Sequence, residues 1–216
     1  MVITVPALVF ADRAEAGRLL GAELDTRGEL PPGALVLGIP RGGVVVAAEV
    51  ARARDGTFDV ALARKVGAPA NPELALGAVG PDGQAMIDMD VAQRLVPHPD
   101  WLRDAVERTR KEVQDRVRRF RGDRPPIDVM GRHVVVVDDG LATGSTARAV
   151  GQWLRGGSAA RSVLAVPVGP PATVERLSDL YDEVVVLETP EPFYAVGEFY
   201  RDFRQVTDEE VIRLLA

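Results

Sequence analysis

Two adjacent aspartates, Asp138 and Asp139, follow four consecutive valines in the stretch VVVVDDGLATGST, residues 134–146. The valines are typical of a buried strand, and the residues after the stretch have helical spacing. Ligands of open parallel sheets bind at the carboxyl ends of the strands. We therefore expect both carboxylates at the ligand-binding edge of a sheet, where they would face a polar partner.

The loop between that strand and the next helix has the composition of a phosphate-binding site. Its glycines let the backbone curl so that successive N–H groups face one anion, and the N-terminus of the following helix adds a favourable dipole. The carboxylates would repel this phosphate unless they faced a vicinal diol or a divalent cation, so the matching ligand is a ribose 5-phosphate. The expected binding residues are Gly140, Leu141, Ala142, Thr143, Gly144, Ser145 and Thr146.

Two other phosphate-binding motifs do not fit this loop. A P-loop requires a lysine directly after its last glycine, whereas Ser145 follows Gly144, and the dinucleotide motif GxGxxG is absent. The remaining alternative is purely structural, in which the acids end a strand and the loop caps a helix.

A second group of candidate residues combines cations with glycines after two other apolar runs. Bare backbone N–H groups beside a guanidinium form a compact anion site. One part follows the run ALVLGIP, residues 34–40, and the other ends the strand predicted over residues 58–66. We expect both parts at the same sheet edge as the acid pair, and ordinary surface cations are the alternative. The members are Arg41, Gly42, Gly43, Arg64 and Lys65.

The spacing of apolar residues predicts the elements that must position these groups. A strand at 34–40, a helix at 42–53 and a strand at 58–66 form a crossover unit, which indicates a parallel sheet. A helix that Asp12 would cap precedes them. The sequence therefore predicts an α/β fold with a central, mostly parallel sheet flanked by helices. The later elements are strands at 133–138, 161–168 and 183–188 and helices at 144–155 and 171–180.

Four further segments lie outside this alternation. Residues 66–99 hold a PDG turn between two strand-like pieces, which predicts a hairpin that leaves the core. The C-terminal helix has capping-box spacing at Thr207 and Glu210. An amphipathic helix is predicted over 100–120, with an apolar face of Leu102, Val106, Val113, Val117 and Phe120. The irregular tail contains Phe193, Tyr194, Phe199, Tyr200 and Phe203.

Composition limits the functions that the chain can have. The 216 residues are 46% hydrophobic, enough for one domain with a buried core, and no apolar run reaches the length of a membrane span. There is no cysteine and there are two histidines, which argues against disulfides, a thiol nucleophile and a zinc site. The N-terminus lacks the features of a signal peptide, so the simplest interpretation is a soluble, cytoplasmic protein.

The charge pattern argues against nucleic acid as a partner. The net charge is −6, which disfavours non-specific binding to nucleic acid or to an anionic membrane. Residues 108–124 carry eight basic and three acidic side chains. This run is expected to be a solvated helix face or a subunit contact in a homodimer, and a nucleic-acid surface is the less favoured alternative.

The stretch at 134–146 closely resembles the phosphoribosyl diphosphate (PRPP) signature of type I phosphoribosyltransferases. The wider pattern PRGG…RK.GAP.NPELALGAV…DDG.ATG is similar to a branch of that family whose acceptor is not evident from sequence. The resemblance covers nearly the whole chain and implies one phosphoribosyltransferase-like domain over residues 1–216. Its core would comprise about 12–66 and 130–188, and a small hood lobe would comprise about 67–99 and 189–206.

In that family the two acids contact the ribose hydroxyls and the loop holds the 5-phosphate. Pyrophosphate lies in a loop after the first core strand, often through a strained non-proline cis peptide, which we expect at Arg41–Gly42. The resemblance implies Mg²⁺-dependent transfer of the 5-phosphoribosyl group from PRPP to a nucleobase-like nitrogen acceptor, with release of pyrophosphate. Asp138, Asp139, Arg41 and Lys65 would be catalytic, Gly42, Gly43 and Arg64 would bind substrate, and the aspartates would hold Mg²⁺ through water.

Two alternatives share the same PRPP site. The chain could be a regulatory protein that binds PRPP without turnover, or it could hydrolyse PRPP with water as the acceptor. No helix-turn-helix pattern precedes the core and the net charge is negative, so the transferase is favoured over the regulator. The tail aromatics would either stack on the acceptor base or pack the hood onto the core, and packing is the favoured interpretation.

Overall fold

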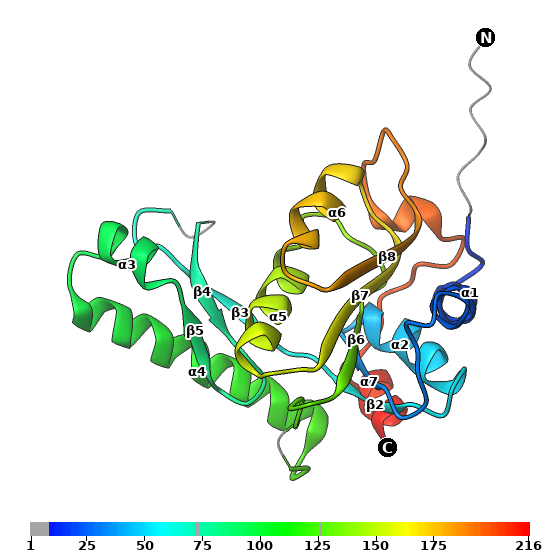
Figure 1. The fold of residues 1–216 in the computed structure, drawn as a ribbon, viewed down its shortest axis with the longest axis horizontal. Coiled ribbons are helices and arrows are strands. Elements are labelled where there is room, and N and C mark those ends of the chain that lie inside the picture. The colour runs from blue at the N-terminus through cyan, green and yellow to red at the C-terminus, as the bar shows by residue number, and fades with distance from the viewer. Residues whose placement is uncertain (1–8, 72–73, 126) are drawn as a thin grey trace.

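Five parallel strands form the central sheet of the computed structural model, which describes residues 9–71, 74–125 and 127–216 (Figure 1). Their order is β2-β1-β6-β7-β8, and every neighbouring pair is parallel. This confirms the predicted α/β class. The strands are β1 (Leu35–Gly38), β2 (Thr57–Val60), β6 (His133–Val137), β7 (Arg161–Val168) and β8 (Glu183–Glu188).

Helices cover both faces of this sheet, which is why its strands read as continuous apolar runs (Figure 1). One face carries α1 (Arg13–Thr26) and α2 (Gly42–Arg52), and the other carries α5 (Ser145–Gly156) and α6 (Pro171–Ser178). Along β6, Val135 and Val137 pack toward α1 and α2, whereas Val134 and Val136 pack toward α5 and α6. Since all of these valines are fully buried, the acid pair is carried by a rigid strand.

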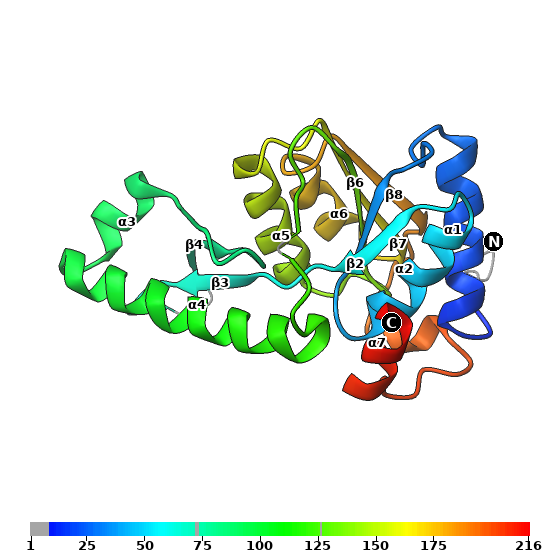
Figure 2. The ribbon, with the colours of Figure 1, turned by 90° about the horizontal axis from the view of Figure 1, so that it is seen from below.

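A smaller lobe, built from residues between β2 and β6, lies beside the central sheet (Figure 2). Its strands are antiparallel, and the predicted PDG turn at 81–83 joins two of them. The predicted amphipathic face of the long helix packs on this small sheet, where Val113 joins Val66 and Val79 in one cluster. The elements are β3 (Arg64–Gly67), β4 (Ala75–Val79), β5 (Ala85–Ile87), α3 (Met89–Leu95) and α4 (Pro99–Arg121).

The strand predicted over residues 58–66 is in fact two strands that belong to different sheets. β2 ends at Val60, and β3 begins at Arg64. Ala61 still donates its N–H to a carbonyl of β1, 2.9 Å away, and the chain then crosses to the small lobe. The crossing residues 61–63 are buried, so the apolar run continues through the change of sheet and its periodicity does not reveal it.

The aromatic tail packs on the opposite side of the central sheet from the small lobe (Figures 1 and 2). It contains a 3₁₀ turn at Val196–Phe199 and leads into α7 (Asp208–Leu215). Its rings join Phe10 and α1 in one cluster, whereas β3, β4 and β5 pack with α4 and α5. The two segments expected to form one hood thus occupy different places, and the division of the chain into a core and a hood stays a proposal.

The ends and lengths of the helices agree with the sequence pattern. The Asp12 carboxylate accepts a hydrogen bond from the Glu15 N–H at 2.8 Å and caps α1. Thr207 and Glu210 form the predicted capping box at the start of α7. Within the described ranges, no helix combines the length and the apolar character needed to cross a membrane.

Candidate functional site

The two sequence motifs meet at the carboxyl edge of the central sheet. Asp138 and Asp139 follow the last residue of β6, and the turn between β1 and α2 lies directly against them. A Cβ atom built on Gly42 would lie 1.8 Å from Asp139 Oδ2, and one built on Gly43 would lie 2.7 Å from Asp138 Cα. Only glycine permits this approach, so both glycines bring the turn up to the acid pair.

Asp139 is held by an arginine from the N-terminal helix. Arg13 Nε lies 2.7 Å from Asp139 Oδ2, and only 10% and 16% of the two side chains are exposed. The Arg13 guanidinium also lies 4.0 Å from the Phe203 ring centroid and donates to the Arg204 carbonyl at 2.9 Å. The Tyr200 hydroxyl donates to the Asp139 carbonyl at 2.6 Å. The aromatic tail therefore fixes Asp139 in place.

Asp138 is the acid that faces the loop of residues 140–146, the predicted phosphate loop. It lines a cavity of about 170 Å³ together with residues 140–147, and its Oδ1 accepts a hydrogen bond from the Asp139 N–H at 2.9 Å. Burial raises the pKa of Asp138 well above the usual value of 3.8, and the neighbouring charge of Asp139 raises this pKa further. The adjacent aspartates thus differ in surroundings, because Asp139 is paired with Arg13 whereas Asp138 lines the cavity.

The phosphate loop has the predicted form of a glycine-containing turn that enters a helix. α5 begins at Ser145, and Gly144 before it has a left-handed φ of 70°. The Thr143 hydroxyl lies 3.3 Å from the Ser145 hydroxyl and 3.4 Å from its backbone nitrogen. The first N–H groups of a helix have no partner within the helix, so this cavity combines amide donors, hydroxyl donors and the positive end of the helix dipole.

A second cavity, of about 260 Å³, adjoins the loop cavity and is lined by three cations. Ser145 and Thr146 line both cavities. Arg64 forms an ion pair of 2.7 Å with Glu112 on α4. The cations are Arg64 and Lys65 of β3 and Arg116 of α4. Arg116 was missed in the sequence, where it belongs to a basic helix surface, because its spacing does not show that α4 returns to the sheet edge.

Arg41 lies at the same sheet edge but points away from the acid pair. Arg41 Nη1 lies 3.5 Å from Asp208 Oδ1 at the start of α7, and the side chain lines a cavity with Arg119 and residues 205–209. Arg41 and Asp138 therefore do not line one cavity. Arg41, Lys65 and Asp138 follow one edge of the sheet but line different cavities.

The non-proline cis peptide is one residue earlier than predicted. It joins Pro40 to Arg41, whereas Arg41–Gly42 was the expected position. Arg41 already has helical dihedrals, with φ −101° and ψ −39°, and its carbonyl accepts from the Val44 N–H at 3.3 Å. The Arg41–Gly42 peptide thus belongs to the first turn of α2, where the chain must be trans.

Most of the tail aromatics pack on Phe10 and α1, and the expectation that they pack a hood onto the core stays a prediction. Phe199 and Tyr200 are buried, although Tyr194 is 77% exposed. Burial raises the pKa of Tyr200, so its hydroxyl stays protonated and donates to the acid pair's backbone. Tyr200 was considered only for stacking or packing, and its contact with the acid pair was not predicted. Arg13 was not predicted as part of the site, because it occupies an ordinary first-turn position of α1 that no local pattern marks.

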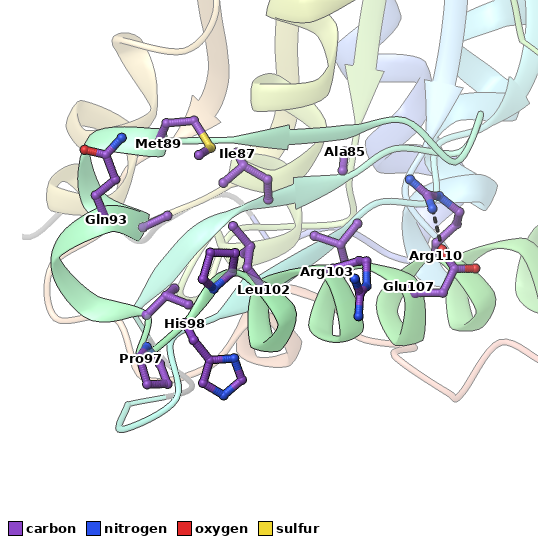
Figure 3. Close-up of a pocket in the computed structure, with 14 residues that line it drawn as sticks. Ala85, Ile87, Met89, Gln93, Pro97, His98, Leu102, Arg103, Glu107 and Arg110 are labelled. Atoms are coloured by element: carbon purple, nitrogen blue, oxygen red, sulfur yellow. Dashed lines mark hydrogen bonds and ion pairs between the residues drawn. The ribbon is translucent and has the colours of Figure 1, made fainter.

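A larger cavity, of about 580 Å³, lies within the small lobe (Figure 3). Figure 3 shows Ile87 of β5, Met89 of α3 and Leu102 of α4 around it. The cavity contains none of the acids or loop residues described above. Its walls are mostly apolar, and its arginines are paired locally: Arg110, for example, bonds to Glu107. We therefore assign the chemistry to the smaller cavities at the sheet edge.

Asp138→Asn is expected to make the unliganded chain more stable at neutral pH. The folded chain holds a proton on Asp138 more tightly than the unfolded chain, so the free energy of unfolding falls as pH rises from 3.8 to the raised pKa. Asparagine keeps the acceptor for the Asp139 N–H and removes this loss. Chemical unfolding between about pH 4 and about pH 8 checks the prediction: the advantage of the variant should grow with pH, and a constant or absent advantage contradicts it.

Comparisons with known proteins agree with this architecture. A family model described as a phosphoribosyl transferase domain matches residues 14–204. Two proteins of Mycobacterium tuberculosis, from strains CDC 1551 / Oshkosh and ATCC 25618 / H37Rv, are each named "Putative phosphoribosyl transferase". Both are 47% identical to the chain over 210 residues, which are 96% of this chain and 46% of theirs. The chain thus spans about half the length of these curated relatives.

A crystal structure of the protein TT1426 from Thermus thermophilus shares the fold over nearly its full length. The two sequences are 46% identical, the TM-score is 0.89, and the match covers 96% of this chain and 98% of that one. The family model covers most of the chain, and a relative of similar length is nearly half identical. The chain therefore belongs to the phosphoribosyl transferase domain family.

Proposed function

We propose that the chain transfers the 5-phosphoribosyl group from PRPP to a nucleobase-like nitrogen acceptor and releases pyrophosphate. The observation that carries this proposal is the pair of adjoining cavities at the sheet edge. One combines the phosphate loop with Asp138, and the other is lined by three cations. PRPP has the matching chemistry, since a phosphate, a diol and a pyrophosphate are joined in one small molecule.

Each part of PRPP has a counterpart among the described residues. The loop residues 140–146 would hold the 5-phosphate with amide and hydroxyl donors. Asp138 would accept hydrogen bonds from the ribose hydroxyls. The pyrophosphate would lie in the cavity of Arg64, Lys65 and Arg116, beside the turn that contains Gly42 and Gly43. The loop cavity and the cation cavity share Ser145 and Thr146, so one ligand can occupy both.

Two of the residues expected to be catalytic would act differently in this arrangement. Asp139 is engaged by Arg13, so it positions the acid pair and reaches the ribose or a metal only when that ion pair opens. Arg41 is engaged by Asp208 and would have to rotate to reach the pyrophosphate. Lys65 keeps its proposed role, with Arg64 and Arg116 beside it. As the bond to pyrophosphate breaks, these cations would stabilise the charge that develops on the leaving group.

The site fits a Mg²⁺ ion that would be bound mainly by oxygen atoms of the substrate. No cluster of three or more carboxylate, histidine or cysteine side chains suited to a metal occurs in the described part of the chain. Mg²⁺ usually keeps several waters and binds through one or two carboxylates and substrate phosphates, so Asp138 would be its protein contact, directly or through water. When bound, the ion would neutralise charge on the pyrophosphate. The residues of this chain would orient the ribose and the phosphates.

A regulatory PRPP-binding protein and a PRPP hydrolase remain the alternatives. The partners in each case would be PRPP and small molecules, without nucleic acid or membrane, in the cytoplasm. A homodimer contact through the basic surface of α4 stays a proposal. Because the curated relatives are about twice as long, the activity of a whole protein of that length could involve groups beyond this chain.

Mg-PRPP is expected to raise the melting temperature of the chain. A ligand at one hundred times its dissociation constant adds about 2.7 kcal/mol to the stability of the native state. Ribose 5-phosphate should produce a smaller shift, because it leaves the three cations without a pyrophosphate. Asp138→Asn should also reduce the shift, although it stabilises the free protein. The proposal fails if Mg-PRPP gives no shift while sulfate shifts wild type and Asp138→Asn equally.

Pyrophosphate release then separates the transferase from its alternatives. Purines, pyrimidines and pyridine carboxylates are each incubated with the chain and Mg-PRPP, and one sample receives no acceptor. Release that requires one acceptor class supports the transferase. Release without an acceptor supports the hydrolase, and a melting shift without any release supports the regulator.

A further inference from the structure

A cavity of about 310 Å³ lies beside the phosphate loop, on the side that faces α6. Thr143, Gly144 and Ser145 line it together with the loop cavity. Neither aspartate of the acid pair lines it, and its other walls come from α5, α6 and the start of β4. The cavity is therefore open to a ligand that does not touch the proposed ribose site.

The charge of this cavity is strongly positive. Its lining includes Lys65 of β3, Arg148 of α5 and Arg176 of α6, and none of its lining residues in the described ranges is an aspartate or a glutamate. The N-terminus of α5 adds the positive end of a helix dipole. Three cations from separate elements that converge on one cavity, in a chain with a net charge of −6, indicate an anionic ligand.

The rest of the lining is apolar. Leu74 and Ala75 form one wall, and Leu177, which is 2% exposed, forms part of another. The volume of about 310 Å³ is at the lower end of the range of about 300 to 1,000 Å³ for small-molecule sites. A bare inorganic anion would leave these apolar walls without a partner, so an organic molecule with one anionic group fits better.

A chain of hydrogen bonds links this cavity to the phosphate loop. Arg176 donates to the Thr173 hydroxyl at 2.9 Å, and that hydroxyl donates to the Ala142 carbonyl at 3.1 Å. Thr173 is buried, with 3% exposure. A ligand that binds Arg176 thus contacts a group that directly supports the phosphate loop.

We propose that this cavity is a second anion site beside the PRPP site, which binds a phosphate monoester of a small organic molecule. The two sites share Lys65 and residues 143–145, but Arg148 and Arg176 line only this cavity. The phosphate would lie between Arg148 and Arg176, and the organic part would lie against Leu74 and Leu177. PRPP has two anionic groups. The 5-phosphate would occupy the loop cavity, and the pyrophosphate would occupy the cation cavity of Arg64, Lys65 and Arg116. To that extent the inference rests on the proposed function, and the third cavity is left for another molecule.

Calorimetric titration of the full chain with phenyl phosphate tests the proposal. The affinity of the double variant Arg148→Ala/Arg176→Ala for phenyl phosphate is expected to be lower by about tenfold or more, because two charge-assisted hydrogen-bond donors are removed. The double variant Arg18→Ala/Arg213→Ala changes the net charge equally at exposed positions on α1 and α7, and it should keep the wild-type affinity. Inorganic phosphate should bind the wild type more weakly than phenyl phosphate does.

Titration in the presence of saturating Mg-PRPP separates the two sites. Phenyl phosphate should still bind the wild type but bind the double variant Arg148→Ala/Arg176→Ala only weakly. The single variant Arg148→Ala, which leaves the Arg176–Thr173 hydrogen bond in place, should keep the melting shift produced by Mg-PRPP. Equal affinity of the wild type and this double variant for phenyl phosphate, or complete displacement by PRPP, overturns the second site. Equal affinity for phenyl phosphate and inorganic phosphate overturns the organic ligand. If PRPP itself does not bind, the proposed function fails, but the dependence of phenyl phosphate binding on Arg148 and Arg176 is still measurable.

Discussion

Gly144→Val is expected to abolish the melting shift that Mg-PRPP produces, with a loss of affinity of about 100-fold or more, which corresponds to about 2.7 kcal/mol. Gly144 has a φ of 70°, and a Cβ atom there would lie 2.9 Å from Leu177 Cδ1 and from Thr173 Cγ2. A branched side chain would therefore push the loop away from α6 and disrupt its amide donors. Melting curves and calorimetric titrations with Mg-PRPP measure the loss.

Gly28→Val is the matched control for this variant. Gly28 has a φ of 74°, and a Cβ atom there would have no neighbour within 4 Å. The backbone strain is thus the same in kind, about 1–2 kcal/mol, but no contact is made and the phosphate loop is distant. Gly28→Val should lose stability and keep the full shift. A Gly144→Val protein that keeps its shift would show that the loop does not hold the phosphate.

Arg13→Met is expected to lower the free energy of unfolding by about 3–5 kcal/mol, because removal of one partner leaves an unpaired, largely buried charge. The stranded group is Asp139, which lies next to a second carboxyl and would lose its ion-pair partner. Methionine retains much of the apolar contact with Phe203. Urea unfolding followed by circular dichroism measures the change.

An exposed ion pair on the same helix provides the comparison. Arg27 Nε lies 2.7 Å from Glu23 Oε1, as close as in the buried pair, but the side chains are 46% and 37% exposed. Arg27→Met should therefore cost less than about 1 kcal/mol. Equal losses for the two variants would mean that Arg13 acts only as a surface residue and does not hold the acid pair.

The parallel sheet and the phosphate loop could be predicted because both depend on local patterns. Four consecutive valines favour a strand that is covered on both faces. The glycines and hydroxyls of residues 140–146 predict a turn whose backbone N–H groups can bind an anion. The PDG turn and the capping box are equally local. For the same reason the strand at 58–66 was wrong: the apolar residues 60–63 of that run are locally suited to a buried strand, and the change of sheet depends on distant partners.

The surroundings of the charged groups could not be predicted from spacing. Arg13 and Asp139 are 126 residues apart in sequence, and nothing in a first-turn arginine shows that it will be buried. The direction of Arg41 depends on Asp208 at the start of α7, and the place of Arg116 depends on how α4 returns to the core. A sequence pattern identifies which cations follow a strand, but the tertiary partners decide where each guanidinium points.

The small lobe is joined to the central sheet at two places. One is the buried crossing at residues 61–63, and the other is the end of α4, where Phe120 packs with Val60 and Val211. The lobe also packs on α5 through β3, β4 and β5, so Arg64, Lys65 and Arg116 stand together before any anion arrives. Their mutual repulsion lowers the stability of the folded chain once, during folding, and binding then requires no further reorganisation of these charges.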